Sequence, residues 1–155
     1  MTPQMATGAA AGIAVAGAGG TAIAYASGAF GYPTYFSVAK EAEEIKNKKK
    51  YIGDNEKEVK GWLKEANKET TYKQALKTKL SSMDGKGLPT KPDQTIINKL
   101  ETPNTLEENE ATSIYNYVTA WCDSKKDLKH KEGGTNDTFD VFKGVCFVNN
   151  TPSAT

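Results

Sequence analysis

The first 39 residues of this chain contain no charged side chain, and every Lys, Asp and Glu lies at Lys40 or beyond it. Residues 5–30 are mostly Ala and Gly, with a few larger apolar residues. A helix that crosses a membrane needs about 20 apolar residues. The aromatic residues Tyr32, Tyr35 and Phe36 follow, where an interfacial belt would lie. The pattern predicts that residues 5–30 form an apolar helix in contact with membrane lipid.

Two other interpretations of this uncharged N-terminal segment remain. Ala24-Tyr25-Ala26 resembles the small-x-small site of a cleaved signal peptide, although Met1–Gln4 supplies no basic side chain ahead of the apolar run. Ala and Gly remove little apolar area from water, so a flexible linker is also compatible with this composition. We prefer an uncleaved anchor and expect three parts: an anchor or signal segment (1–36), a helical domain (37–148) and a disordered tail (149–155).

Small residues recur every fourth position along the apolar segment. They form a candidate face for helix association: Gly8, Gly12, Ala16, Gly20, Ala24 and Gly28. This spacing lets transmembrane helices approach closely. A segment this rich in Ala and Gly also produces such ladders by chance. Beside contact with membrane lipid, we therefore consider self-association through this face.

The charged part is rich in Lys and contains no Arg. Arg is the preferred residue for recognising phosphates and bases, so its absence argues against nucleic-acid recognition. The preferred explanation of this absence is a low-GC genome, which favours Lys codons. Residues 40–100 hold 15 Lys and 10 acidic residues, whereas residues 101–155 hold 5 Lys and 9 acidic residues. Next to a membrane, the cluster at residues 46–50 (KNKKK) could attract anionic lipid and favour a cytoplasmic domain, although we prefer a simpler interpretation. The preferred interpretation is a solvated, lysine-rich helix end, which also suits the helix dipole.

Apolar side chains recur at helical spacing in the first half of the charged part. Residues 37–50 favour a helix by propensity, and Asp54 is a plausible N-cap for the next one. One stripe consists of Val59, Trp62, Leu63 and Ala66. A second stripe consists of Tyr72, Ala75, Leu76, Leu80 and Met83. Both are predicted to face the core.

The second half of the charged part predicts two more helices and one ambiguous segment. Asp93 can cap a short helix over 94–101, and Thr105 with Glu108 has capping-box spacing for a helix that ends near Lys126. The long helix has the apolar stripe Ile114, Tyr117, Val118, Trp121 and Cys122. Residues 139–148 are the most strand-like, but a lone strand forms no sheet, so a short helical cap is the alternative.

The expected fold class is therefore mainly α. An N-terminal apolar helix, transmembrane or signal, precedes a small helical bundle with a short extended C-terminal segment. Cys122 and Cys146 lie in apolar surroundings. Outside the cytoplasm they would form a disulfide, and in a reducing cytosol they would be two buried thiols. Two Cys and one His without a CxxC motif do not suit a metal site.

We expect no enzyme and no cofactor. His130 is the only histidine and lies in a charged segment. A nucleophilic pair of Cys122 and His130 is conceivable, but the sequence does not constrain its geometry. The acidic residues Glu107, Glu108 and Glu110 are explained by the start of a helix, where negative charge is stabilising.

The arrangement resembles the small, uncharacterised paralogous proteins of haemotropic mycoplasmas, wall-less bacteria that live on red blood cells. The resemblance lies in the small-residue segment from Gly8 to Gly28, Trp121 with Cys122, Cys146, and the Arg-free composition. It implies a membrane-anchored surface protein with an interaction or antigenic role, and it supplies no catalytic residues.

This role, with the helical domain outside the cell membrane, is the preferred prediction. The alternative is a cytoplasm-facing membrane adaptor that contacts anionic lipid through its Lys-rich half. Neither interpretation identifies a protein partner.

Overall fold

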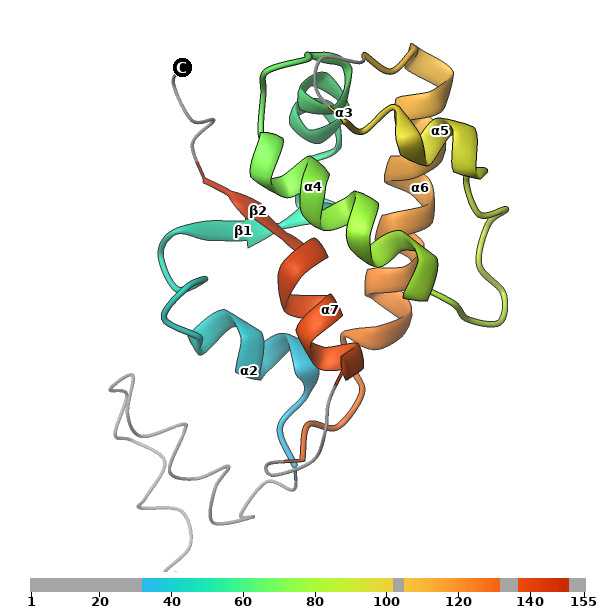
Figure 1. Cartoon of the computed structure of the whole chain (residues 1–155). Helices are drawn as coiled ribbons and strands as arrows, with labels where there is room; N and C mark the ends of the chain where they lie inside the picture. The colour runs from blue at the N-terminus through green and yellow to red at the C-terminus, as the bar shows by residue number, and fades with distance from the viewer. Residues whose placement is uncertain (1–31, 102–104, 132–136, 151–155) are drawn as a thin grey trace, which may run out of the picture. The chain divides into compact units, whose positions relative to one another are not determined.

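The computed structural model describes residues 32–101, 105–131 and 137–150 (Figure 1). The chain divides into two compact units, residues 1–33 and 34–155, and the second is described below. The elements described are α2 (Tyr35–Glu41), β1 (Lys49–Tyr51), η1 (Ile52–Asp54), α3 (Glu56–Lys64), α4 (Thr70–Lys79), η2 (Leu80–Ser82), α5 (Gln94–Asn98), α6 (Glu108–Lys125), α7 (Asp137–Val145) and β2 (Phe147–Asn149). The mainly helical class is confirmed, with the addition of a small sheet.

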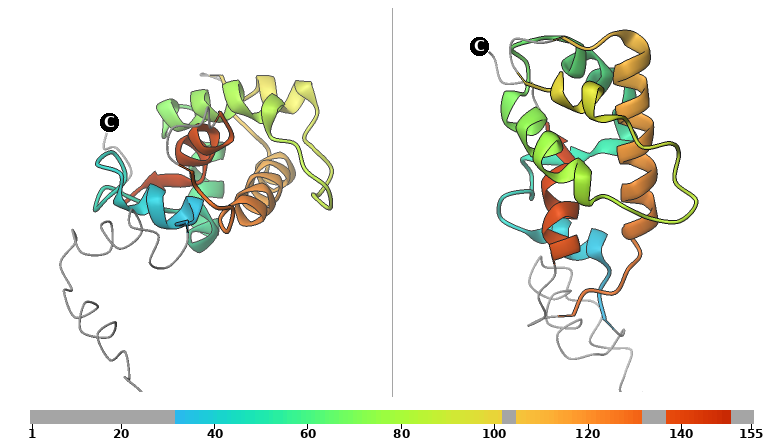
Figure 2. Two further views of the ribbon diagram at one scale, coloured as in Figure 1. Left: turned by 90° about the horizontal axis from the view of Figure 1, so that it is seen from below. Right: turned by 45° about the vertical axis from the view of Figure 1, so that its right-hand side comes forward.

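The long helix α6 runs along one side of the domain and packs on α3, while α7 packs against both α4 and α2 (Figures 1 and 2). The predicted stripes supply the core between these helices. Fully buried members, at most 2% exposed, include Val59, Leu63, Leu76, Leu80, Ile114, Val118 and Trp121. Burial of each large apolar side chain contributes about 1.5–3 kcal/mol. Ala66 and Ala75 are only partly buried.

The strand-like C-terminal segment forms a helix and then a strand. Helix α7 buries Phe139, Phe142 and Val145 along one face, and β2 follows at once. β2 pairs antiparallel with β1, with Lys50 opposite Val148. The partner strand that the sequence did not reveal therefore lies about a hundred residues earlier in the chain.

The helix expected over 37–50 ends early. Helix α2 stops at Glu41, and Ala42 is extended, with φ −63° and ψ 135°. The chain then turns through Asn47, whose φ is 61°, into β1. Residues with good helix propensity form a strand here because pairing with β2 satisfies the hydrogen-bonding groups of their backbone. Tertiary pairing outweighs a propensity of a few tenths of a kcal/mol per residue.

Three predicted helix starts have different outcomes. The carboxylate of Asp93 accepts hydrogen bonds from the amides of Thr95 (2.9 Å) and Ile96 (3.1 Å), which confirms this cap, although α5 ends at Asn98. Asp54 closes η1, and Asn55 precedes α3 instead.

The cap predicted at Thr105 is wrong. Glu107 and Glu110 form the capping box of α6, and the Glu110 carboxylate accepts from the Glu107 amide at 2.9 Å. Leu106 is buried, 4% exposed, which fixes the chain just before this start.

The predicted anchor (5–30) and its association face from Gly8 to Gly28 lie outside the described residues. Among the helices of the described ranges, none combines the length and apolar character that a membrane crossing requires. At the other end, Asn149 belongs to β2 and the Asn150 amide donates to Lys48 O at 2.9 Å. The rest of the predicted tail, 151–155, lies outside the described residues.

Candidate functional site

Cys122 and Cys146 are joined by a disulfide. Cys122 lies in the last turn of α6 and Cys146 lies between α7 and β2, with their Cα atoms 5.7 Å apart. Both residues are fully buried, with 0% exposed. The pair that the sequence singled out is therefore brought together. In this oxidised state Cys122 carries no thiolate, so a Cys122–His130 hydrolase has no nucleophile.

His130 packs against aromatic rings. Its ring centroid lies 4.3 Å from that of Phe139 and 6.1 Å from that of Tyr35. Its Nδ1 atom is buried without a hydrogen-bond partner among the described residues. The sequence placed His130 in a charged, exposed segment, whereas the structure places its ring against α2 and α7.

A cleft of about 490 Å³ lies where α2, η1 and the end of α6 meet. It is lined by Thr34, Phe36, Tyr51, Gly53, Asp54, Thr119, Asp123, Lys126 and Asp127. Three carboxylates and one ammonium give it an acidic character. A Cβ at Gly53 would lie 2.9 Å from the Tyr51 ring, so glycine permits this close approach.

Hydrogen bonds organise the acidic cleft around one carboxylate. Asp123 Oδ1 accepts from the Tyr51 hydroxyl at 2.9 Å and from Lys126 Nζ at 3.1 Å. Burial, followed by the hydrogen bond to Asp123, raises the pKa of Tyr51 far above its ordinary value. The phenol therefore stays protonated and serves as a donor. The cleft can orient a polar or cationic group, but Tyr51 is no general base near neutral pH.

A second hollow of about 330 Å³ lies between α4, α6 and α7. It carries charges of both signs: Lys79 and Lys125 face it together with Asp84, Asp137 and Asp140. Lys125 Nζ lies 5.8 Å above the ring of Trp121, within the range of a cation–π contact. No group of three His, Cys, Asp or Glu residues in the described part of the chain could hold a metal ion.

The lysine cluster at residues 46–50 is largely engaged by acidic or carbonyl groups. Lys46 pairs with Glu41 at 2.7 Å, and Lys48 Nζ donates to Glu43 O at 2.9 Å. Lys50 pairs with Glu58 of α3. Neither predicted alternative, a lipid-attracting cluster or a solvated helix end, describes this arrangement fully. The cluster does not lie at the end of a helix, and its charges are partly neutralised within the domain.

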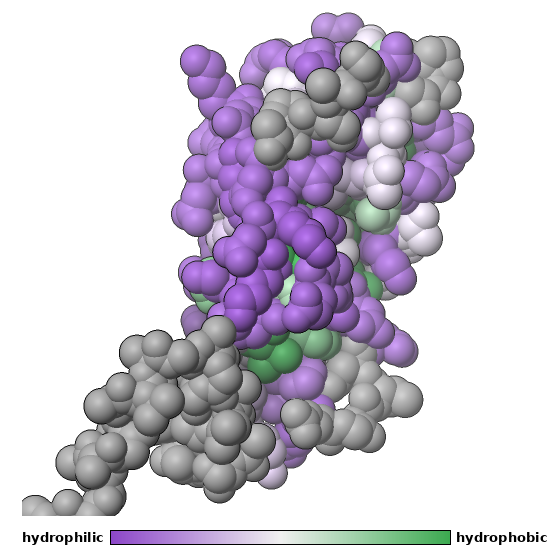
Figure 3. Space-filling model, turned by 90° about the vertical axis from the view of Figure 1, so that its left-hand side faces the viewer, coloured by the Kyte–Doolittle hydropathy of each residue, from purple (hydrophilic) through white to green (hydrophobic). Residues whose placement is uncertain are grey.

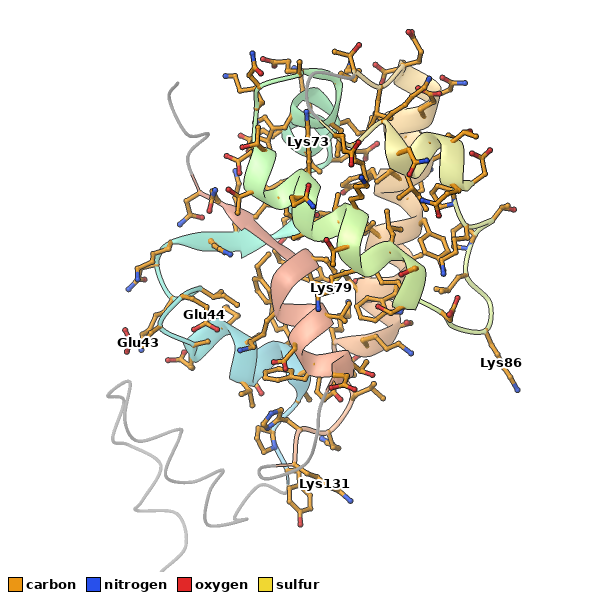
Figure 4. The ribbon with its side chains drawn as sticks, viewed as in Figure 1. Glu43, Glu44, Lys73, Lys79, Lys86 and Lys131 are labelled. Atoms are coloured by element: carbon orange, nitrogen blue, oxygen red, sulfur yellow. A yellow bond between two sulfur atoms is a disulfide. The ribbon has the colours of Figure 1, made fainter. Side chains whose placement is uncertain are left out.

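Lys73 is a buried lysine that no pattern in the sequence indicates. It is 2% exposed, and its ammonium reaches from α4 toward α3, where it donates to Glu65 O at the C-cap (Figure 4). Burial lowers the pKa of Lys73. By contrast, Lys86 points away from the domain at the tip of its loop (Figure 4). No protein-family model, curated protein or solved structure matches this chain.

Proposed function

We propose that this is a membrane-anchored, surface-displayed protein without catalytic activity, held by residues 5–30 and displaying the helical domain. The observation that supports this proposal best is the buried disulfide between Cys122 and Cys146. Disulfides persist in oxidising compartments and are rare in a reducing cytosol. A domain whose core contains a cystine is therefore better suited to the outer side of a membrane.

The surface of the domain also suits exposure to water. The face in Figure 3 is mostly hydrophilic, with small apolar areas. In the described part of the chain, the large apolar side chains that remain exposed are Tyr32 (59%) and Leu128 (43%). Isolated apolar residues of this kind are ordinary on soluble domains. The proposed role is accordingly an interaction or antigenic one, as the resemblance to the mycoplasma surface proteins implies.

The cytoplasmic adaptor is less well supported. Its lipid contact would depend on the lysine cluster at residues 46–50, but Lys46 and Lys50 are already paired with the carboxylates of Glu41 and Glu58. Attraction to anionic lipid falls when a charge is neutralised by a nearby carboxylate. A vesicle-binding measurement at low and physiological salt would detect any remaining attraction.

Protease treatment of intact cells tests the proposal. An impermeant protease should remove the helical domain from intact cells, while a cytosolic marker protein stays whole. Thiol alkylation under denaturing conditions should label Cys122 and Cys146 only after reduction. A domain protected until the cells are permeabilised, with both thiols labelled without reduction, would instead support the cytoplasmic adaptor.

A further inference from the structure

We propose that the Cys122–Cys146 disulfide is a redox-controlled lock on α2, the short helix that connects the domain to the N-terminal segment. The biological setting of this lock depends on the proposed surface location, whereas the lock itself concerns residues 34–150 alone. Helix α2 has seven residues and a Thr34–Ser37 capping box. Isolated helices shorter than about 12–15 residues are marginal in water, so α2 depends on what it is docked to.

The first support of α2 is the backbone that follows α6. The amide of Tyr35 donates to Leu128 O at 2.8 Å, and the amide of Phe36 donates to Lys126 O at 3.0 Å. Thr34 forms an antiparallel bridge with Lys129. Residues 126–129 therefore bind the start of α2 by main-chain hydrogen bonds.

The second support is aromatic and comes from α7 and β2. The ring of Tyr35 lies 5.0 Å from that of Phe139 and 5.9 Å from that of Phe142. The ring of Phe36 lies 5.9 Å from that of Phe147. Tyr35 is buried, with 7% exposed, so this contact removes most of its ring from water.

The disulfide joins these two supports. The amide of Lys126, in the first support, donates to Cys122 O at 2.9 Å. Cys146 directly precedes Phe147 of the second support, and its amide donates to Phe142 O at 3.0 Å. One covalent bond, added to the packing of α6 on α7, therefore holds the two surfaces that α2 bridges at their separation.

Other contacts hold each support to the rest of the domain. The Tyr72 hydroxyl binds α7 to α4 through Val145 O, and α6 packs on α3. After reduction, α7 can stay on α4 and residues 126–129 can stay with α6, but their mutual spacing then depends on the noncovalent packing of α6 on α7. Because α2 bridges both, it is the element that should detach first.

The redox step is thiol–disulfide exchange with a dithiol reductant. A thiolate of the reductant attacks one sulfur and releases the other cysteine as a thiolate, and the second thiol then resolves the mixed disulfide. Two electrons and two protons end on Cys122 and Cys146, and the reductant leaves as a disulfide. Because both cysteines are fully buried, exchange requires a local opening of the domain.

Hydrogen exchange on the full-length protein tests this lock. The readout compares α2, where the Val38 amide donates to Thr34 O, with α3, where the Val59 amide donates to Asn55 O. Treatment with a small dithiol should speed exchange in α2 at least tenfold more than in α3. Equal acceleration in both helices, or loss of all protection, would show a general staple and overturn the proposal, as would unchanged exchange.

Two variants complete the test. The double variant Cys122→Ala with Cys146→Ala should reproduce the α2-selective effect without any reductant. Val59→Ala, with the disulfide intact, is the matched control and should speed exchange in α3 more than in α2. These outcomes do not depend on membrane side, so failure of the lock and failure of the surface location are distinguishable.

Discussion

The hydroxyl of Tyr72 donates a buried hydrogen bond of 2.8 Å to the carbonyl oxygen of Val145, joining α4 to the end of α7 across 73 residues of sequence. Tyr72→Phe leaves that carbonyl without its donor. An unsatisfied buried acceptor costs about 1–3 kcal/mol. We expect the free energy of unfolding in urea to fall by about this amount. Tyr51→Phe, which removes an exposed hydrogen bond to Asp123, is the control and should cost less.

Tyr72 also links stability to alkaline pH. Burial raises the pKa of its hydroxyl in the folded state far above the ordinary value of 10.0. The folded state then retains a proton that the unfolded state loses, so this contribution is complete below pH 10 and declines as the pH rises above it. Urea denaturation between pH 9 and pH 11 should show this decline. A Tyr72→Phe variant that declined as steeply as the parent would refute the assignment.

The disulfide between Cys122 and Cys146 should contribute strongly to stability. It closes a loop with a sequence separation of 24. By the chain-entropy estimate, such a loop is worth about 3 kcal/mol. Thermal unfolding with and without a dithiol should differ by roughly 10–20 °C in Tm. A change of only a degree or two would mean that the native packing alone holds these two segments together.

Lys73 should give the domain a distinct dependence on mildly alkaline pH. Burial lowers its pKa in the folded state below the ordinary 10.5, so the unfolded state binds the proton more tightly. Stability from this group is therefore lowest at acidic and neutral pH and rises as the pH approaches 10.5. The stability difference between the parent and Lys73→Met should shift in favour of the parent as the pH rises toward 10.5. Lys86→Met, which removes a lysine from an exposed position, is the matched control.

Glu110 should contribute to acid sensitivity. Its carboxylate pairs with Lys99 at 2.6 Å and caps the start of α6, and these hydrogen bonds lower its pKa. The folded-state contribution is present above its ordinary pKa of 4.5 and is lost as the pH falls below that value. Glu110→Gln should therefore flatten the fall in stability between pH 5 and pH 3. An unchanged slope would show that other carboxylates account for acid unfolding.

Much of the helical core could be predicted because its evidence is local. The stripe Val59, Trp62 and Leu63 repeats at helical spacing, and all three side chains are buried. The cap at Asp93 is likewise set by a carboxylate within three residues of the amides that it binds. In the candidate site, only the cysteine pair was anticipated, since two Cys in apolar stretches leave one possible intramolecular partner each.

The uncharged N-terminal segment, the helical stripes and the possibility of one intramolecular disulfide can all be read from the residues alone. That residues 49–51 form a strand follows only from the folded domain, because their hydrogen-bond partners in β2 lie about a hundred residues away. Only the folded domain likewise shows that His130 packs on Phe139, that Lys73 is buried at the end of α3, and that α2 bridges the two sides of the disulfide. Each of these features depends on contacts between segments that are distant in the sequence. The free energy of these contacts exceeds the local conformational preferences of the residues, which are all that a sequence pattern reflects.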